Sequence, residues 1–279
     1  MLKQRVLTAL VLGPFIIWSI LTFSHLALAI EMGLIVMLAG WEWARMAGIR
    51  HQLARVAYAL VVAGFLLFIT WLLHRNGDLQ LTILYVSSVG WLAAMLAIIY
   101  FNKKAIVVID GFSIKVIVLN LLVGILVLTG AYVAVIGLHR FESGAAYILI
   151  LFILIWGADT FAYFAGKAFG KHKLAVNVSP GKTWEGVAGG VAGTVIVAYI
   201  ITIYLGLASP SNWYFVIITI ITVGFSIVGD LIVSLFKRRA GVKDSSQLLP
   251  GHGGILDRID SLLSASPIFL LCLLLAGVK

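Results

Sequence analysis

The chain has 279 residues, of which 62% are hydrophobic and only 11% are charged, and its mean hydropathy is +1.11. A soluble domain carries roughly a quarter charged residues, so this composition excludes a soluble globular protein and indicates a chain whose solvent is lipid. The formal net charge is +9. In a membrane protein such a surplus indicates basic residues in the cytoplasmic loops, so we expect no nucleic-acid partner.

Nine stretches are apolar over about the 20 residues that a transmembrane helix needs. They leave no room for a soluble domain, so we predict an all-α, polytopic transmembrane bundle of about nine helices in a single integral membrane domain, 1–279. The first two stretches nearly touch, which leaves eight helices as an alternative count. The first stretch exceeds the ~7–15 apolar residues of a cleaved signal and is predicted to be retained. The nine stretches are 6–24, 26–44, 55–73, 79–101, 114–138, 145–166, 184–207, 213–236 and 261–278.

Most basic residues lie in every second loop, and these loops share one side of the membrane. The loops on the opposite side hold Arg75, Arg140 and little else, so the positive-inside rule predicts a protein of the cytoplasmic (inner) membrane with a cytoplasmic N-terminus and an external C-terminus. Both long polar loops, 167–183 and 237–260, are then cytoplasmic. We treat 1–140 as the N-terminal helical part and 141–279 as the catalytic part. The basic residues on the cytoplasmic side are Lys3, Arg5, Arg50, Arg55, Lys103, Lys104, Lys171, Lys173, Lys182, Lys237, Arg238, Arg239, Lys243 and Arg258.

One acidic residue inside a predicted span leads directly into a dense polar segment. Asp230 is followed by Ser234 four residues on and Lys237 seven residues on, and these offsets place all three on one face of a helix. A charge within a membrane helix is costly and often serves function. We therefore favour a functional role for Asp230 over a structural ion pair.

Other acidic residues within predicted spans are more ambiguous. Asp159 begins a similar polar stripe with Tyr163 and Lys167, and a functional role and a structural ion pair remain equally open for it. Glu31 and Glu42 are predicted to be interhelical hydrogen-bond partners or interfacial groups rather than functional residues.

The polar run from 234 to 260 reads SLFKRRAGVKDSSQLLPGHGGILDRID. Asp257 and Asp260 are three residues apart at a helix start, so their carboxylates face the same way. With Asp230 they form a candidate Mg²⁺ site, because Mg²⁺ takes carboxylates, phosphate oxygens and water. The glycine-rich turn at 251–254 offers backbone N–H groups to an anion. The basic residues of this run suit a polyphosphate, whereas a solvated basic loop would explain the arginines alone: Lys237, Arg238, Arg239, Lys243 and Arg258.

The loop before the seventh span contains Gly-Lys-Thr at 181–183. It is not a P-loop, because GxxxxGK[ST] requires glycine where Val176 stands. We predict Ser179 to be the N-cap of the next helix, with Lys182 and Thr183 presenting donors to a phosphate. A well-capped helix without a ligand is the alternative. That helix also carries glycines whose spacing predicts close packing against a neighbour: Gly186, Gly189, Gly190 and Gly193.

The polar run resembles the CDP-diacylglycerol synthase family, also called phosphatidate cytidylyltransferases. Segments 179–186 and 158–170 look like further family segments, so the resemblance covers most of the C-terminal half. The family pattern runs from S-x-hydrophobic-K-R through K-D to H-G-G-hydrophobic-x-D-R-hydrophobic-D. It is filled here by Ser234, Lys237, Arg238, Lys243, Asp244, His252, Gly253, Gly254, Asp257, Arg258 and Asp260.

The resemblance implies an enzyme that makes CDP-diacylglycerol and pyrophosphate from CTP and phosphatidate. It also implies Mg²⁺, with K⁺ as a candidate second cation, and a homodimer. Catalytic roles fall to Asp230, Ser234, Lys237, Asp257 and Asp260, of which the three aspartates would hold the metal. The substrate phosphates would contact Ser179, Lys182, Thr183, Lys237, Arg238, Lys243, His252, Gly253, Gly254 and Arg258, and weaker candidates are Asp159, Lys167 and Asp244.

Three other activities were weighed against this one. A CTP-dependent lipid kinase has similar metal and phosphate requirements but would release CDP rather than pyrophosphate. A phosphatidyltransferase that consumes CDP-lipids is disfavoured, because its DGxxAR…GxxxDxxxD pattern is absent. A transporter would place its acidic residues near the bilayer midplane on broken helices, whereas here they gather at one face.

Overall fold

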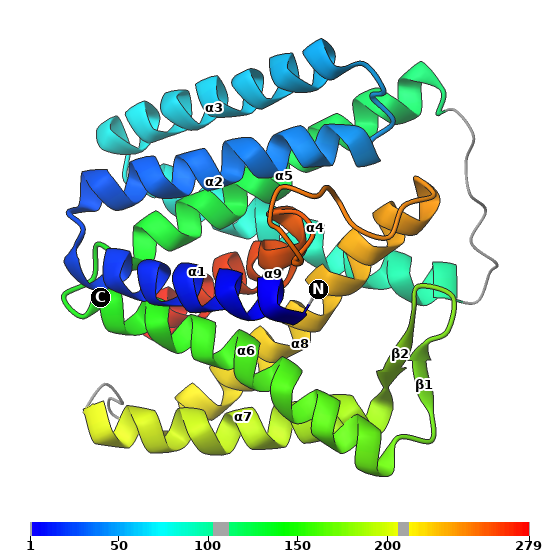
Figure 1. The fold of residues 1–279 in the computed structure, drawn as a ribbon. Coiled ribbons are helices and arrows are strands. Elements are labelled where there is room, and N and C mark those ends of the chain that lie inside the picture. Colours follow the sequence, from blue (N-terminus) through cyan, green and yellow to red (C-terminus); the bar gives the residue numbers. More distant parts are fainter. Residues whose placement is uncertain (1, 103–111, 206–211, 279) are drawn as a thin grey trace.

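The computed structural model describes residues 2–102, 112–205 and 212–278, and they form a helical bundle (Figure 1). Its helix boundaries agree with the predicted spans to within a few residues. The elements are α1 (Leu2–Thr22), α2 (His25–Met46), α3 (Gln52–Arg75), α4 (Asp78–Asn102), α5 (Ile114–Leu138), α6 (Gly144–Phe169), β1 (Lys173–Ala175), β2 (Ser179–Thr183), α7 (Trp184–Leu205), α8 (Asn212–Arg239) and α9 (Leu256–Leu275).

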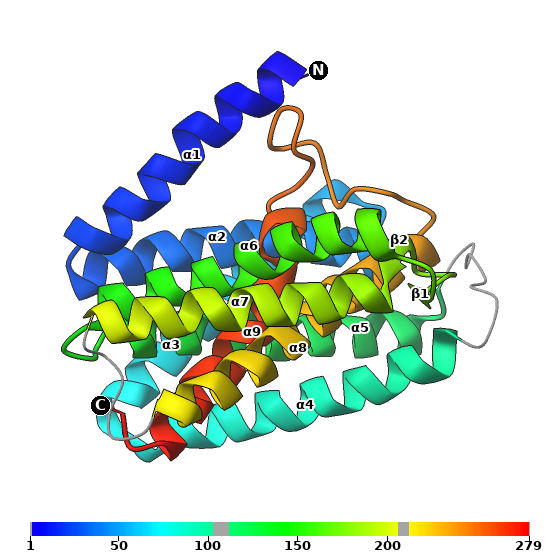
Figure 2. The same ribbon diagram turned by 90° about the horizontal axis from the view of Figure 1, so that it is seen from below.

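The predicted polytopic bundle is confirmed. Within the described residues, eight helices, α2 to α9, are long and apolar enough to cross a membrane, and α1 contributes a shorter apolar stretch, Leu10–Thr22. The near-fusion of the first two spans is resolved at Ser24, whose hydroxyl accepts a hydrogen bond from the Ala27 N–H and caps α2. From there α1 extends away from the other helices (Figure 2).

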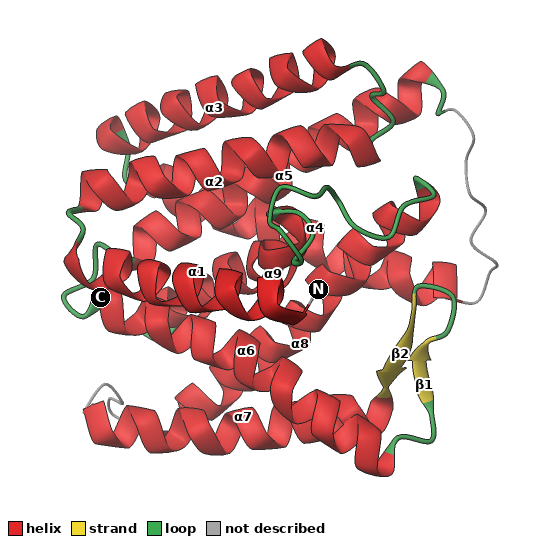
Figure 3. Cartoon of the chain, viewed as in Figure 1, coloured by secondary structure: helices red, strands yellow, loops and turns green. Residues whose placement is uncertain are grey.

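A short antiparallel hairpin joins α6 to α7, and the sequence did not predict it (Figure 3). The predicted N-cap role of Ser179 is wrong, because Ser179 begins β2 and α7 begins five residues later. Thr183 caps α7 instead, with its Oγ1 accepting a hydrogen bond from the Gly186 N–H at 3.1 Å. The hairpin therefore places Lys182 just before the first turn of α7.

Helix α9 lies in the centre of the bundle. It packs against α4, α5, α6 and α8, and thirteen of its twenty residues are buried. Helices from both halves of the chain therefore share one core around α9 (Figure 1). The start of α9, which carries the predicted site residues Asp257, Arg258 and Asp260, is fixed by this packing.

Glycines bring two pairs of helices unusually close, as predicted for α7. A Cβ on Gly186 would lie 2.9 Å from the Ala162 carbonyl oxygen of α6, and one on Gly190 would lie 2.9 Å from that of Ala158. On α8, a Cβ on Gly229 would lie 2.5 Å from the Asp260 carbonyl oxygen of α9. These approaches hold α6 against α7 and α8 against α9.

The loops rich in basic residues lie at one end of the bundle. The α2–α3, α6–α7 and α8–α9 connections share the right-hand side of Figure 1. Two residues used to predict the orientation, Lys103 and Lys104, lie outside the described residues, and the side chains of Lys3 and Arg5 are likewise not described.

Candidate functional site

Asp230 and Lys182 meet where α8 passes the start of α7. The Lys182 Nζ contacts Asp230 Oδ2, and the Ser234 hydroxyl donates a hydrogen bond to Asp230 Oδ1 at 3.2 Å. The predicted common face of Asp230 and Ser234 is confirmed by this contact. Each side chain of the ion pair keeps about a quarter of its surface exposed, 24% for Lys182 and 26% for Asp230, so a ligand can reach the pair.

The carboxylates of two further residues lie near this ion pair. Asp260 on α9 interacts electrostatically with Asp230, Lys182 and Lys237. Asp159 on α6 interacts with Lys182 and Asp230. The structure therefore gathers Asp159, a weaker candidate from the sequence, with the main ones. We call Asp159, Lys182, Asp230 and Asp260 the carboxylate cluster.

Asp257 faces a different set of partners from Asp260. Its Oδ1 accepts a hydrogen bond from Lys237 Nζ at 2.7 Å. Its Oδ2 accepts three more, from the backbone N–H and hydroxyl of Ser245 and from the Gly254 N–H. Only 5% of the Asp257 side chain is exposed, so this carboxylate fixes Lys237 and the α8–α9 loop in place.

The glycine-rich turn binds a carboxylate of the protein itself, that of Asp257. Gly254 donates its N–H to Asp257, and Gly253 adopts a φ of +84°, a conformation that favours glycine. A Cβ on Gly253 would lie 2.7 Å from Asp257 Oδ2. The neighbouring His252 has a buried Nδ1 without a hydrogen-bond partner among the described residues.

Glu42 joins the N-terminal half of the chain to this loop. Its fully buried carboxylate accepts hydrogen bonds from the hydroxyls of Ser245 and Ser246, at 2.9 and 2.5 Å. It also accepts the backbone N–H groups of Ile255 and Leu256, at 2.9 and 2.6 Å, where α9 begins. The prediction of a hydrogen-bonding role for Glu42 is confirmed, and its negative charge lies at the favourable end of the α9 dipole.

Ser245, Ser246 and Arg45 also belong to the site, although the sequence did not predict them. Arg45 donates to the Ser245 carbonyl oxygen at 3.2 Å, and both serines are buried. Two adjacent serines in a loop otherwise rich in lysine and arginine were the available signal. Their partner Glu42 is distant in sequence, so the signal could not be interpreted without the fold.

The remaining predicted residues lie around the site with differing exposure. Lys243, Asp244 and Arg258 are exposed on the α8–α9 connection and the first turn of α9, and Arg238 and Ser179 are half-buried. Thr183 is buried as the α7 cap. Lys167 is exposed and lies 6.0 Å above the ring of Tyr163. Their predicted roles in the site stay predictions.

The side chains of the site include carboxylates, which are ligands that Mg²⁺ prefers. Within the described residues, no three His, Cys, Asp or Glu side chains are grouped to hold one ion, and Asp257 already accepts four hydrogen bonds. Asp230 and Asp260 interact with each other, and Mg²⁺ is commonly held by one or two carboxylates together with substrate phosphates and water. The residues present therefore fit a two-carboxylate site that a triphosphate would complete, and the three-aspartate site stays a prediction.

Comparisons with known proteins cover nearly the whole chain. The model of the cytidylyltransferase family matches residues 3–276. The chain is 41% identical to a phosphatidate cytidylyltransferase of Pseudomonas aeruginosa, over 99% of this chain and 98% of that protein. It is 39% identical to one from Haemophilus influenzae, over 96% and 97%. A third, from Staphylococcus saprophyticus, is 45% identical over 50% of this chain and 54% of that protein.

Proposed function

The chain belongs to the cytidylyltransferase family, and we propose that it transfers the cytidylyl group of CTP to phosphatidate, giving CDP-diacylglycerol and pyrophosphate. It is a nucleotidyltransferase of phospholipid biosynthesis embedded in a membrane. CTP and phosphatidate are its substrates.

One structural observation supports assigning this activity to a particular part of the fold. The starts of α7 and α9 and the C-terminal part of α8 converge on the ion pair of Lys182 with Asp230 and on the nearby Asp260. The pair lies beside the basic loops, at an end of the bundle that both a water-soluble nucleotide and a membrane lipid can reach. Such a position suits a reaction between CTP and phosphatidate.

The reaction requires positioning and charge neutralisation more than covalent help. A phosphate oxygen of phosphatidate attacks the α-phosphorus of CTP, the new P–O bond forms, and the bond to the β-phosphate oxygen breaks, so that pyrophosphate leaves with its electron pair. Lys182 and Lys237 neutralise charge on the transferring group and the leaving group. Asp230 and Asp257 hold these two ammonium groups in position.

Asp230 and Asp260 are the residues that we propose to hold Mg²⁺. A bound divalent ion would neutralise the triphosphate and orient it. The proposed roles of the exposed cations Lys243 and Arg258 are to attract CTP from solution. K⁺ as a second cation rests on the family resemblance, as does a homodimer, which crosslinking in the membrane would test.

We further propose that the basic end of the bundle is cytoplasmic, because most lysines and arginines lie there. Cysteines introduced at Lys171 and at Asn76, in connections at opposite ends of the bundle, test this orientation. A membrane-impermeant maleimide added outside intact cells should label the cysteine at 76 and spare that at 171. The reverse labelling would overturn the orientation.

The activity is tested by incubating the purified chain with phosphatidate, Mg²⁺ and CTP labelled at the α-phosphate. The label should enter the lipid fraction while pyrophosphate appears in equal amount. A lipid kinase would instead leave the label in water-soluble CDP. That result would overturn the proposed reaction.

A further inference from the structure

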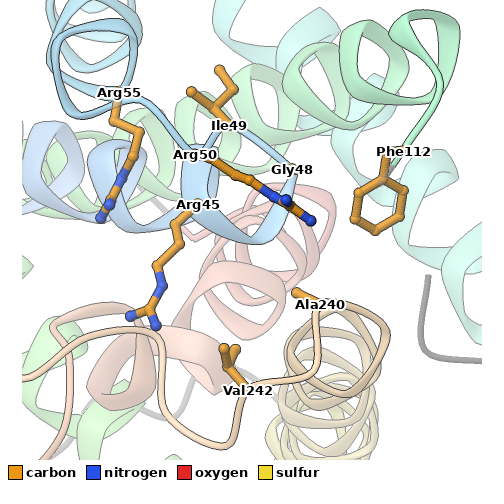
Figure 4. A pocket seen from close by; sticks show the side chains of 8 residues that line it. All are labelled: Arg45, Gly48, Ile49, Arg50, Arg55, Phe112, Ala240 and Val242. Carbon is orange, nitrogen blue, oxygen red and sulfur yellow. The ribbon is translucent and has the colours of Figure 1, made fainter. Parts of the chain in front are cut away.

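A pocket of about 330 Å³ opens beside the catalytic loop. It lies between the α2–α3 connection, the residue that precedes α5 and the segment after α8 (Figure 4). Its lining includes three arginines, Arg45, Arg50 and Arg55, together with the apolar residues Ile49, Phe112 and Val242. None of the described residues that line it is acidic, so the pocket is strongly cationic.

Two of the three arginines lie close enough for their charges to repel each other. Arg45 and Arg55 interact electrostatically. The Arg55 guanidinium is stacked over the Trp41 ring, 4.2 Å from its centroid, and its buried Nε has no hydrogen-bond partner among the described residues. One carboxylate, Glu42, acts on Arg55, but its oxygens already accept the hydroxyls and N–H groups that hold the start of α9. Arg45 and Arg55 together therefore carry more positive charge than Glu42 balances.

Charge of this kind and density matches a phosphate group. Arginine offers a planar fork of donors that binds phosphate oxygens in pairs. Grouped like charges raise the free energy of the empty pocket, and a bound anion would remove that repulsion. A ligand with a phosphate is thus favoured over a neutral one.

The surroundings of the pocket favour a lipid as the bearer of that phosphate. Leu53 at the start of α3 and Ile114 at the start of α5 are 73% and 80% exposed, and in a membrane-spanning chain such surfaces face acyl chains. A phosphate could occupy the pocket while its acyl chains remain in the bilayer.

We propose that this arginine pocket binds the phosphate of an anionic membrane lipid, at a site separate from the carboxylate cluster. The hydrogen bond from Arg45 to the Ser245 carbonyl oxygen connects this pocket to the catalytic residues, because Ser245 also holds Asp257. Two lipids share the required chemistry. Phosphatidate, a phosphate monoester, would be held there before reaction, and a phosphodiester lipid such as phosphatidylglycerol would be held as a non-reacting ligand.

Lipid binding without CTP tests this site independently of the proposed reaction. The full chain is placed in neutral detergent micelles with phosphatidate or with phosphatidylglycerol, and the lipid retained is measured by native mass spectrometry. Arg55→Gln and Arg50→Gln are compared with Arg75→Gln. Arg75 is a matched control, because it lies at the other end of α3 and stacks over Trp71 in the same way, at 4.3 Å.

Arg55→Gln should weaken lipid binding by roughly tenfold, the effect of losing one charge-assisted hydrogen bond, and Arg75→Gln should leave it unchanged. A loss confined to phosphatidate would identify a site that holds the substrate, and an equal loss for both lipids would identify a general anionic-lipid site. Wild-type binding of both lipids by Arg55→Gln and Arg50→Gln would overturn the proposal. Loss of CTP binding in these variants with lipid binding intact would also overturn it.

Discussion

Two lysines and three aspartates meet around the starts of α7 and α9. Lys182 contacts Asp230, and Lys237 contacts Asp257, so Asp260 is the aspartate left without an ion pair of its own. This arrangement leaves a surplus of negative charge that a divalent cation would neutralise. The two ammonium groups are held in position before substrate arrives, so little reorganisation is needed when charge develops during the reaction.

Lys182→Gln is expected to lower kcat by about 100-fold or more, because it removes one preorganised cation from the transferring phosphates. Initial rates with saturating CTP and phosphatidate measure the effect. Lys171→Gln, at an exposed residue of the same α6–α7 connection, is the control and should keep the wild-type rate. Equal rates for both variants would show that Lys182 has no role in the mechanism.

Asp257→Asn is expected to reduce turnover by about 100-fold while the chain still folds and inserts. The amide group would present a donor to the Lys237 ammonium, which would then lose its fixed position. Asp78→Asn changes an exposed acid at the start of α4, at the opposite end of the bundle, and should have little effect. Undiminished activity of Asp257→Asn would reject any catalytic contribution of the Asp257–Lys237 pair.

Local geometry explains which site contacts were predictable. Ser234 follows Asp230 by four residues, and their hydrogen bond follows from the helix alone. The donors to Glu42 could not be identified in this way, because Ser245 and Ser246 are 203 and 204 residues away in sequence. Contacts across that distance depend on how α2 and α9 pack, which hydropathy does not specify.

Contacts between two pairs of helices position the site. Glu42 ties α2 to the first turn of α9, and the glycines of α7 hold that helix against α6. The spans themselves were predictable, because each needs only a long apolar run. The β1–β2 hairpin was not, since its strands have three and five residues and β2 contains Pro180 and Gly181, which usually indicate a turn.

Glu42→Gln is expected to destabilise the protein by about 1–3 kcal/mol, because buried donors of the α8–α9 loop would lose their acceptor. The midpoint of thermal unfolding in detergent should fall, and activity should fall with it as the start of α9 loosens. Glu31→Gln changes a glutamate about three turns earlier on the same helix, away from that loop. An equal loss of stability in both variants would show that Glu42 has no special role.

Gly190→Val should separate α7 from α6, because the new side chain would meet the Ala158 carbonyl oxygen. Asp159 and Lys182 would then no longer approach each other as they do, so both stability and turnover should drop. Gly224→Val on α8 is the matched control, since a Cβ there meets nothing within 4 Å. Wild-type behaviour of Gly190→Val would contradict the tight α6–α7 packing.

At the scale of the whole molecule, the bundle separates an apolar exterior from a polar end. Large apolar side chains are exposed along α3 and α4, as expected for surfaces that contact lipid. The carboxylate cluster and the arginine pocket both lie near the end with the basic loops. Composition and hydropathy predicted this organisation, but the separate partners of Asp257 and Asp260 emerged only from the packing of α8, α9 and their loop.

The central claim is that Asp230 and Asp260, rather than Asp257, receive the divalent cation. Electron paramagnetic resonance titration of Mn²⁺ in the presence of CTP tests it directly. Asp230→Asn and Asp260→Asn should each weaken Mn²⁺ binding by more than about tenfold, and Asp257→Asn should bind Mn²⁺ nearly as the wild type does. Loss of binding in Asp257→Asn together with normal binding in Asp230→Asn and Asp260→Asn would contradict the account.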